Sequence, residues 1–167
     1  LGLAYIERIK GKKYKNIEAA IEIYRQVLEV LTIENRPAEW AMAMNNLGNA
    51  YFNRISGDRA DNIEEAIEAY NQSMKVRRKE NMPFDWATCM NNLGLAFTDR
   101  IKGDRADNLE KAIECFDQVL QVRTPQTVPT AWATTMNNLA FAYLNRINGN
   151  KGDNLEEAIK KYEQALT

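Results

Sequence analysis

The chain has 167 residues, of which 45% are hydrophobic and only four are proline, so its composition predicts a folded protein rather than a disordered segment. Its 22 basic and 23 acidic residues give a net charge of −1, which argues against nucleic acid and against an anionic membrane surface as partners. The absence of histidine excludes histidine metal sites and catalytic pairs in which histidine activates a serine or a cysteine.

The remaining composition points to a non-catalytic protein of the cytoplasm. Cys89 and Cys115 show no CxxC spacing, so we expect free thiols in a reducing compartment. No apolar run approaches the roughly 18 residues of a membrane span. Neighbouring acids such as Glu64 and Glu65 stand at a predicted helix start, where they stabilise the helix dipole. We therefore expect no catalytic residue, no metal site and no cofactor.

The sequence repeats itself at intervals of 46 residues. NNLGNAY, which begins at Asn45, recurs as NNLGLAF from Asn91 and as NNLAFAY from Asn137. The same interval separates the members of three further columns, which are Trp40, Trp86 and Trp132; Gly11, Gly57, Gly103 and Gly149; and Asn16, Asn62, Asn108 and Asn154. Such a period is typical of an array of similar structural units.

The repeats divide the chain into units of about 1–36, 37–82, 83–128 and 129–167. Residues 1–5 (LGLAY) match residues 93–97 (LGLAF), so we expect the chain to begin inside a truncated first helix. We interpret 1–167 as a single solenoid fragment of a longer array. Solenoid ends normally carry polar caps, and here the first unit lacks the turn that carries the tryptophan, which leaves the next hairpin partly uncovered. We therefore predict end-to-end self-association through uncapped repeats.

Each unit is predicted to form a helical hairpin. In the second unit, apolar residues three or four apart predict a first helix from about Ala38 to Ile55, with Pro37 at its start and Gly57 at a left-handed exit. These residues are Trp40, Met44, Leu47, Tyr51 and Ile55. We expect the three tryptophans of this column to be buried where successive hairpins meet.

A second helix follows in the same unit. We predict that Asn62 caps it, that Glu65 completes a capping box, and that the helix extends to about Lys79. Its apolar stripe consists of Ile63, Ala66, Ile67, Tyr70 and Met74. The third and fourth units repeat both helices in the same order.

These residues carry a family resemblance. MNNLGNAY followed by NIEEAIEAYNQSM resembles the two helices of a tetratricopeptide repeat, with Leu47, Gly48 and Tyr51 in the first helix and Ala66 and Tyr70 in the second. The units are longer than usual and are similar to those of kinesin light chains and, through RIxGDRADN, to bacterial arrays that precede a CHAT protease domain. The resemblance implies an all-α, right-handed α-solenoid of about four helical hairpins.

A recurring arginine stands at the last turn of each first helix, inside the apolar stripe. The four residues are Arg8, Arg54, Arg100 and Arg146. A guanidinium in this position needs a carboxylate, so we predict that these arginines form a structural clasp and that Arg54, Arg100 and Arg146 are more than half buried. The expected partners in the second unit are Asp61 or Glu64, in the loop or helix start that follows.

The repeated amides lie on the side of the first helix opposite the apolar stripe, where we expect them to be exposed. The resemblance implies that first helices line a concave groove and that the asparagine before LG or LA, here Asn46, Asn92 and Asn138, holds the backbone of an extended peptide. The full predicted peptide-binding set is Asn46, Asn92, Asn138, Asn45, Asn91, Asn137, Asn49, Asn53, Leu95, Asp99, Phe141 and Asn145.

The predicted function is a non-catalytic scaffold that binds a protein or peptide in this asparagine-lined groove. An amide offers both a donor and an acceptor, which suits a peptide backbone of any sequence. The alternative is a structural spacer or a self-assembly array, such as the regulatory segment of a larger bacterial CHAT-protease protein. In that alternative the ends and the convex face act, and the polar groove is only solvated.

Overall fold

The computed structural model describes residues 2–6 and 12–166, and every regular element in this part of the chain is an α-helix. The helices are α1 (Gly2–Ile6), α2 (Lys13–Val30), α3 (Pro37–Phe52), α4 (Arg59–Met74), α5 (Pro83–Asp99), α6 (Arg105–Leu120), α7 (Pro129–Leu144) and α8 (Lys151–Ala165). The predicted all-α fold is confirmed. The chain forms two compact units, Leu1–Asn81 and Met82–Thr167.

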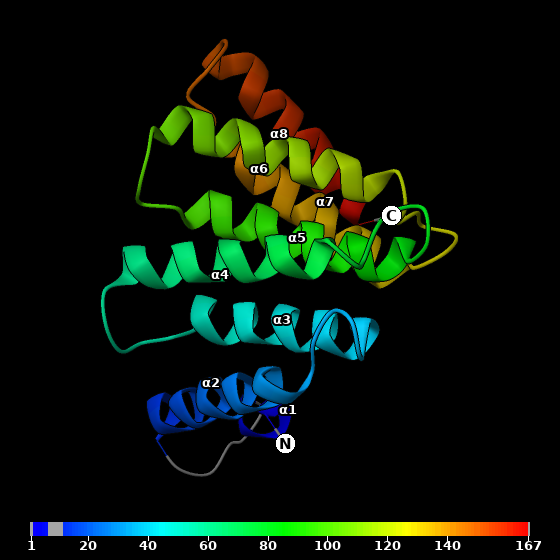
Figure 1. The fold of residues 1–167 in the computed structure, drawn as a ribbon. Helices are drawn as coiled ribbons and strands as arrows, with labels where there is room; N and C mark the ends of the chain where they lie inside the picture. The colour runs from blue at the N-terminus through cyan, green and yellow to red at the C-terminus, as the bar shows by residue number, and fades with distance from the viewer. Residues whose placement is uncertain (1, 7–11, 167) are drawn as a thin grey trace. The chain divides into compact units, whose positions relative to one another are not determined.

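Each unit is a series of neighbouring helices that pack in chain order. In the first unit α2 packs against α1 and α3, and α3 packs against α4 (Figure 1). In the second unit α6 packs against both α5 and α7, and α7 packs against α8. A core cluster of the second unit comprises Ala112, Ile113, Phe116, Leu139 and Ala142, with Leu95 and Tyr143 among the partly buried residues around it.

The first helices begin where predicted and end earlier. α3, α5 and α7 start at Pro37, Pro83 and Pro129, whose missing N–H group costs nothing in a first turn. α3 ends at Phe52, although we expected it to reach Ile55. Ile55 lies beyond the helix and is exposed, so it does not belong to the apolar stripe.

The second helices begin about one turn earlier than predicted. The N-cap of α4 is Asp58, whose side chain accepts a hydrogen bond from the N–H of Asp61 at 3.0 Å. The predicted cap at Asn62, with its capping box to Glu65, is therefore wrong. Aspartate caps a helix as well as asparagine does, and the earlier start adds hydrogen-bonded residues to a helix that has already been nucleated.

The C-terminal end of α4 also differs from the prediction. The helix ends at Met74 instead of near Lys79. The reason is a tightening of the backbone, because the N–H groups of Lys75 and Val76 bond to carbonyl groups three residues earlier. Asn81 then closes the following loop by donating to the Val76 carbonyl.

The asparagine column that we expected to cap the second helices holds the preceding loops. Asn62 lies inside α4, is buried, and donates from Nδ2 to the Ser56 carbonyl at 2.9 Å. Equivalent bonds close the loops before α6 and α8. The turn of each loop is a glycine with positive φ, as predicted; these are Gly57 (79°), Gly103 (78°) and Gly149 (81°).

The two helices of a hairpin approach closely at the glycine of the NNLG motif. A Cβ atom added to Gly48 would lie 2.6 Å from a ring carbon of Tyr70, and one added to Gly94 would lie 2.7 Å from a ring carbon of Phe116. Both rings are almost fully buried. Glycine is therefore required here by space, because these aromatic rings occupy the position of its missing side chain.

The tryptophan and cysteine predictions have different outcomes. Trp86 is buried, whereas Trp40 and Trp132 are only partly buried, so the expectation for the tryptophan column is confirmed at one of three positions. Cys89 and Cys115 are free thiols, and both are buried. Burial raises the pKa of the Cys115 thiol to about 12, which leaves it protonated and unreactive at neutral pH.

Candidate functional site

The residues predicted to contact a peptide lie on α3, α5 and α7. Their exposure differs from one position to the next. Asn45 and Asn91 are buried; Asn46, Asn49, Asn92, Leu95 and Asn138 are partly buried; Asn53, Asp99, Asn137, Phe141 and Asn145 are exposed. In α3 and α5 the first amide of the repeated pair is thus more buried than the second.

The first amide of the pair belongs to the interior, although we expected it on an accessible face. Oδ1 of Asn91 accepts hydrogen bonds from Oγ1 of Thr135 and from Nδ2 of Asn138, both on α7, at 3.3 Å each. These bonds link two successive first helices. Asn137 has no later first helix in the chain to cover it, and it is exposed.

The second amide of the pair is partly buried, although we expected it to be exposed. Nδ2 of Asn138 donates one hydrogen bond to Asn91, while the side-chain oxygen of Asn138 has no hydrogen-bond partner in the described residues. Nδ2 of Asn45 is 3.5 Å from Oδ1 of Asn46. A buried first amide therefore contacts a more accessible second amide, within one pair for Asn45 and Asn46 and between α5 and α7 for Asn91 and Asn138.

In α3 and α5, the next residue of the predicted set contacts the second helix of its own hairpin. The hydroxyl group of Tyr70 donates to Oδ1 of Asn49 at 2.9 Å. In the following hairpin Phe116 has no hydroxyl group, and the residue equivalent to Asn49 is Leu95, which packs against the cluster that contains Phe116. The contact is therefore polar between α3 and α4 and apolar between α5 and α6. In both hairpins the residue at this position packs against the second helix.

The last members of the set complete the helix ends. Asn53 and Asn145 are the C-cap residues of α3 and α7. Each donates from Nδ2 to a backbone carbonyl four residues earlier, Asn49 and Phe141 respectively, at 2.8 Å. Each of these carbonyls also accepts a hydrogen bond from the backbone N–H of the same asparagine, so the side-chain amide adds a second bond at the helix end.

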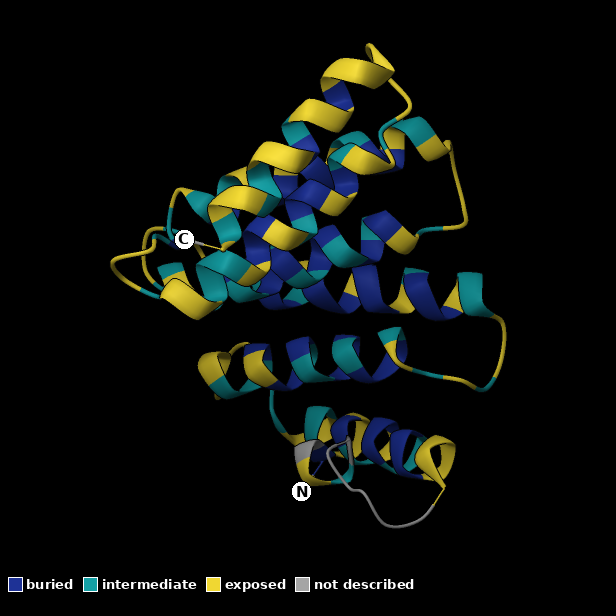
Figure 2. Cartoon of the chain, turned by 180° about the vertical axis from the view of Figure 1, so that it is seen from behind, coloured by how far each residue is buried: buried dark blue, intermediate teal, exposed yellow. Residues whose placement is uncertain are grey.

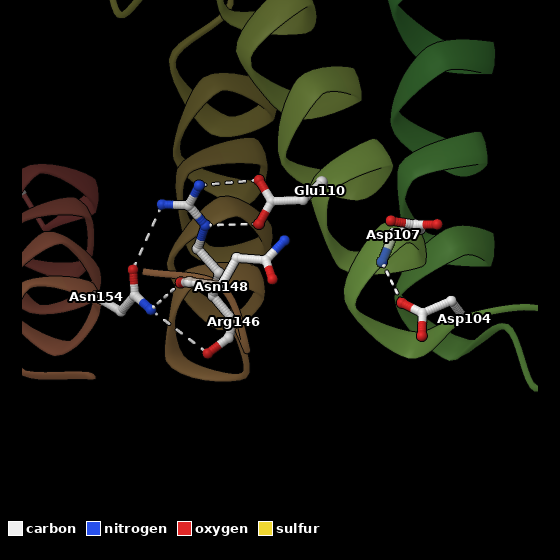
Figure 3. Close-up of polar contacts among 6 residues, drawn as sticks. All are labelled: Asp104, Asp107, Glu110, Arg146, Asn148 and Asn154. Carbon is white, nitrogen blue, oxygen red and sulfur yellow. Dashed lines mark hydrogen bonds and ion pairs between the residues drawn. The ribbon is translucent and has the colours of Figure 1, made fainter. Parts of the chain in front are cut away.

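Two of the recurring arginines, Arg54 and Arg146, form ion pairs with the preceding hairpin. Nε and Nη2 of Arg146 donate to the two carboxylate oxygens of Glu110 at 2.8 and 2.9 Å (Figure 3). Arg54 holds Glu18 in the same bidentate way, at 2.8 and 2.7 Å. In each pair the glutamate stands 36 residues earlier, on a second helix. The predicted partners in the following loop are wrong, because the guanidinium points toward the neighbouring hairpin.

The burial predicted for this clasp is confirmed where its ion pairs are described. The side chains of Arg54 and Arg146 retain 28% and 29% of their accessible surface. Nη1 of each also approaches Oδ1 of the loop-closing asparagine, at 3.4 Å, and Arg100 does the same at 3.3 Å. Arg8 lies outside the described residues.

The ion pairs shift the pKa of both partners. The hydrogen bond from Arg146 is the main cause that lowers the pKa of Glu110, and partial burial of the carboxylate opposes it. The pKa of Glu18 is lowered in the same way by Arg54. The pKa of each arginine is raised by its glutamate. Both members of each pair are therefore charged at neutral pH.

One buried arginine has no counterpart among the predicted residues. Arg123 follows α6, and its Nη1 and Nη2 groups donate to Oγ1 of Thr135 and Oγ1 of Thr88 at 3.1 Å each. The equivalent position in the first hairpin is Leu31. The equivalent residue after α4 is Arg77, which is also buried, so the signal in the sequence is an arginine that recurs after two second helices where the first hairpin carries leucine.

Two other kinds of site are absent from the described ranges. Within residues 2–6 and 12–166, no helix is both long enough and apolar enough to span a membrane. In the same ranges, no three cysteine, aspartate or glutamate side chains come together as a metal site would require.

The chain was then compared with known proteins. No curated protein matches it. Among solved structures it is similar to the crystal structure of BtubC (BKLC) from P. vanneervenii, with 18% sequence identity and a TM-score of 0.69. The match covers 92% of this chain and 57% of that chain, so this chain spans little more than half the length of that protein. At this identity the likeness establishes the fold alone.

A family model identifies the repeats directly. The model for the tetratricopeptide repeat matches residues 40–80, 86–125 and 132–166, which together make up more than half of the chain. Each match begins at one of the three tryptophans that define the 46-residue units. The chain therefore belongs to the tetratricopeptide repeat family.

Proposed function

We propose that this chain is a non-catalytic binding module that holds an extended peptide segment through amides of its first helices. The observation that carries the proposal is the recurrence of a partly accessible amide, Asn46, Asn92 and Asn138, at one position of three first helices. Tetratricopeptide repeats are typical of protein-interaction scaffolds, and this agrees with the proposal.

The chemistry of these amides suits a peptide main chain. Each side chain carries donors and an acceptor, so it pairs with both the N–H and the C=O groups of an extended segment. Each such hydrogen bond contributes about 1 kcal/mol net, and three residues supply a few kcal/mol without specifying a sequence. Specificity then comes from accessible neighbours, among which Asp99 and Phe141 are exposed and Leu95 is partly exposed.

The rival function is a spacer or self-assembly array, and two observations favour it. Asn91 and Asn138 bond to one another, so the amides already have a structural role between first helices. Apolar residues are exposed on α2 and α8, namely Val30 on α2 and Leu155 and Ile159 on α8. In this alternative these apolar faces are contact surfaces and the polar stripe binds water.

Selection of peptides from a displayed random library tests the proposal. The wild-type chain is compared with a triple variant, Asn46→Ala, Asn92→Ala and Asn138→Ala, on each selected peptide. We expect affinity to fall by more than about threefold, which corresponds to about 0.7 kcal/mol. A matched control removes three amides from the second helices, Gln26→Ala, Asn71→Ala and Gln118→Ala, and should bind as the wild type does.

Two results would support the spacer instead. One is equal affinity of the triple variant and the wild type for the selected peptides. The other is the absence of any selected peptide, together with concentration-dependent association of the chain in analytical ultracentrifugation. Circular dichroism at the binding temperature shows whether each variant remains folded, which keeps a loss of affinity separate from a loss of structure.

A further inference from the structure

Asn148 and Gly149 form the one asparagine–glycine pair in the sequence. They lie in the loop between α7 and α8, and both are exposed. The equivalent loops carry Ser56 and Lys102 before their glycines, so this pair is confined to the α7–α8 hairpin. A main-chain nitrogen reaches the side-chain amide of the preceding asparagine most readily when it belongs to glycine, which has no side chain to obstruct the approach.

The main-chain nitrogen of Gly149 is unoccupied in this loop. Its N–H group has no hydrogen-bond partner in the described part of the chain, whereas a residue inside a helix donates to the carbonyl four residues earlier. The loop has left that pattern, because α7 ends at Leu144 and Gly149 has a φ of 81°. The nitrogen can therefore act as a nucleophile without first breaking a hydrogen bond.

The side-chain amide of Asn148 stands beside the ion pair between Arg146 and Glu110 (Figure 3). The hydrogen bond from Arg146 is the largest cause that lowers the pKa of Glu110, and a hydrogen bond from the Asn148 side chain lowers it further. The side chain of Ser56 makes the equivalent hydrogen bond to Glu18. A neutral donor at this position thus stabilises the carboxylate that the clasp arginine holds.

We propose that Asn148 is a site of spontaneous deamidation and that its product weakens the ion pair between Arg146 and Glu110. The main-chain nitrogen of Gly149 loses its proton to water or hydroxide and bonds to Cγ of Asn148. The bond from Cγ to Nδ2 breaks, and the nitrogen takes a proton from water and leaves as ammonia. Water then opens the cyclic imide at either carbonyl carbon, which gives aspartate or isoaspartate. The proposal is independent of peptide binding.

Either product adds a negative charge close to the clasp. In aspartate the new carboxylate replaces the donor beside Glu110, so two carboxylates compete for the Arg146 guanidinium. In isoaspartate the former main-chain carbonyl of residue 148, which accepts from Nδ2 of Asn154 at 2.8 Å, becomes part of the new carboxylate. The main chain is also lengthened by a carbon atom next to the Gly149 turn. Both products therefore weaken the link from this loop to α6.

Peptide mapping of the aged chain tests the reaction. The chain is incubated at physiological temperature and mildly alkaline pH and is then digested with trypsin. Residues 147–151 are released as one peptide, because trypsin cleaves after Arg146 and Lys151. Mass spectrometry should find the amide converted to acid at Asn148 but not at Asn150 of the same peptide. A sample digested at zero time corrects for conversion during digestion.

Two comparisons show whether the folded loop permits the reaction. Asn148→Gln should stay unmodified, because its longer side chain disfavours the cyclic imide. The chain unfolded in guanidinium chloride should convert at Asn148, as the folded chain does. The proposal is overturned if the unfolded chain reacts and the folded chain does not, since the loop then protects its amide. It is also overturned if Asn150 converts as fast as Asn148.

Stability measurements test the effect on the ion pair. Asn148→Asp reproduces one product, and Asn148→Ser is the matched control, because serine occupies the equivalent position 56. Urea denaturation should give a lower midpoint for Asn148→Asp than for Asn148→Ser. On a Glu110→Gln background the difference between these two variants should shrink, because the carboxylate that repels the new charge is gone. Equal midpoints, or a difference that is the same on both backgrounds, overturn the proposal.

Discussion

The hairpins α5–α6 and α7–α8 share one sequence pattern but differ in burial. Leu109 on α6 has 1% relative exposure, whereas its counterpart Leu155 on α8 has 44%. α6 packs against both α5 and α7, and the packing partner of α8 is α7. Figure 2 shows the result as a largely exposed α8. An amphipathic pattern thus marks the face that can be buried, and a neighbouring helix decides whether it is.

The α5–α6 hairpin also has an ion pair and a close helix contact that the α7–α8 hairpin lacks at the equivalent positions in the described residues. Glu110 on α6 is held by Arg146, whereas its counterpart Glu156 on α8 is exposed and has no ion pair in the described part of the chain. Gly94 lets the ring of Phe116 approach α5, while Ala140 occupies the equivalent position in α7. The α5–α6 hairpin should therefore be the more sensitive of the two to substitution.

Equivalent leucine truncations should show the largest difference. Leu109→Ala should lower the free energy of unfolding by about 3 kcal/mol, because it leaves a cavity in a packed interior. Leu155→Ala should cost less than about 1 kcal/mol, since its side chain is already half exposed. Urea denaturation followed by circular dichroism measures both. Backbone amides of α8 should also exchange with deuterium faster than those of α6. Equal losses would contradict the comparison.

Removal of the clasp arginine should have the next largest effect. Arg146→Ala should destabilise the chain by about 2 kcal/mol, because Glu110 is left partly buried without its partner. Arg146→Met should cost less, since methionine retains the packed aliphatic stem. The same denaturation experiment compares the three proteins. A melting curve of Arg146→Ala that coincides with that of the wild type would exclude a stabilising clasp.

Substitution of the close-contact glycine should have a smaller effect. Gly94→Ala should destabilise by about 1 kcal/mol, because the new Cβ atom collides with the Phe116 ring and the better helix propensity of alanine offsets only part of that cost. A double variant, Gly94→Ala with Phe116→Leu, should relieve the collision. Differential scanning calorimetry would test this, and a Gly94→Ala variant that melts above the wild type would refute it.

The smallest expected effect is a pH dependence of the clasp. The pKa of Glu110 in the folded chain is lowered from 4.5, so its ion pair contributes stability above about pH 4.5 and loses it as pH falls through the lower folded value. The stability difference between wild type and Glu110→Gln should therefore be largest at neutral pH and shrink below pH 4.5. Glu156→Gln is the control and should differ little from wild type at any pH. A Glu110→Gln difference that is constant down to acidic pH would contradict the prediction.

Much of the fold could be predicted because it depends on local chemistry. The 46-residue period, the proline starts and the positive-φ glycines all follow from residue type and spacing, and the structure agrees with each. The second-helix starts could not be predicted from the same rules. Asp58 and Asn62 are both good caps one turn apart, and the choice between them depended on which side chain closed the loop at Ser56.

The candidate site was less predictable, because a first helix in a repeat array packs against its own hairpin on one side and can pack against a neighbouring repeat on another. Asn45 and Asn91 lie opposite the apolar stripe of their own hairpin, which the sequence alone reads as solvent-facing. Asn91 is nevertheless buried, because α7 lies against that side of α5. The same limitation explains the wrong acids predicted for Arg54, whose actual partner stands 36 residues earlier.

The sequence by itself determined the helices, the repeat and the family, because propensity, capping and periodicity act within a few residues of one another. Only the tertiary structure decided which glutamate Arg54 and Arg146 hold, which amide is buried in the pairs of α3 and α5, and that no carboxylate of the described residues pairs with Arg123. Those properties depend on distances between segments tens of residues apart, and such distances exist only once neighbouring hairpins have packed.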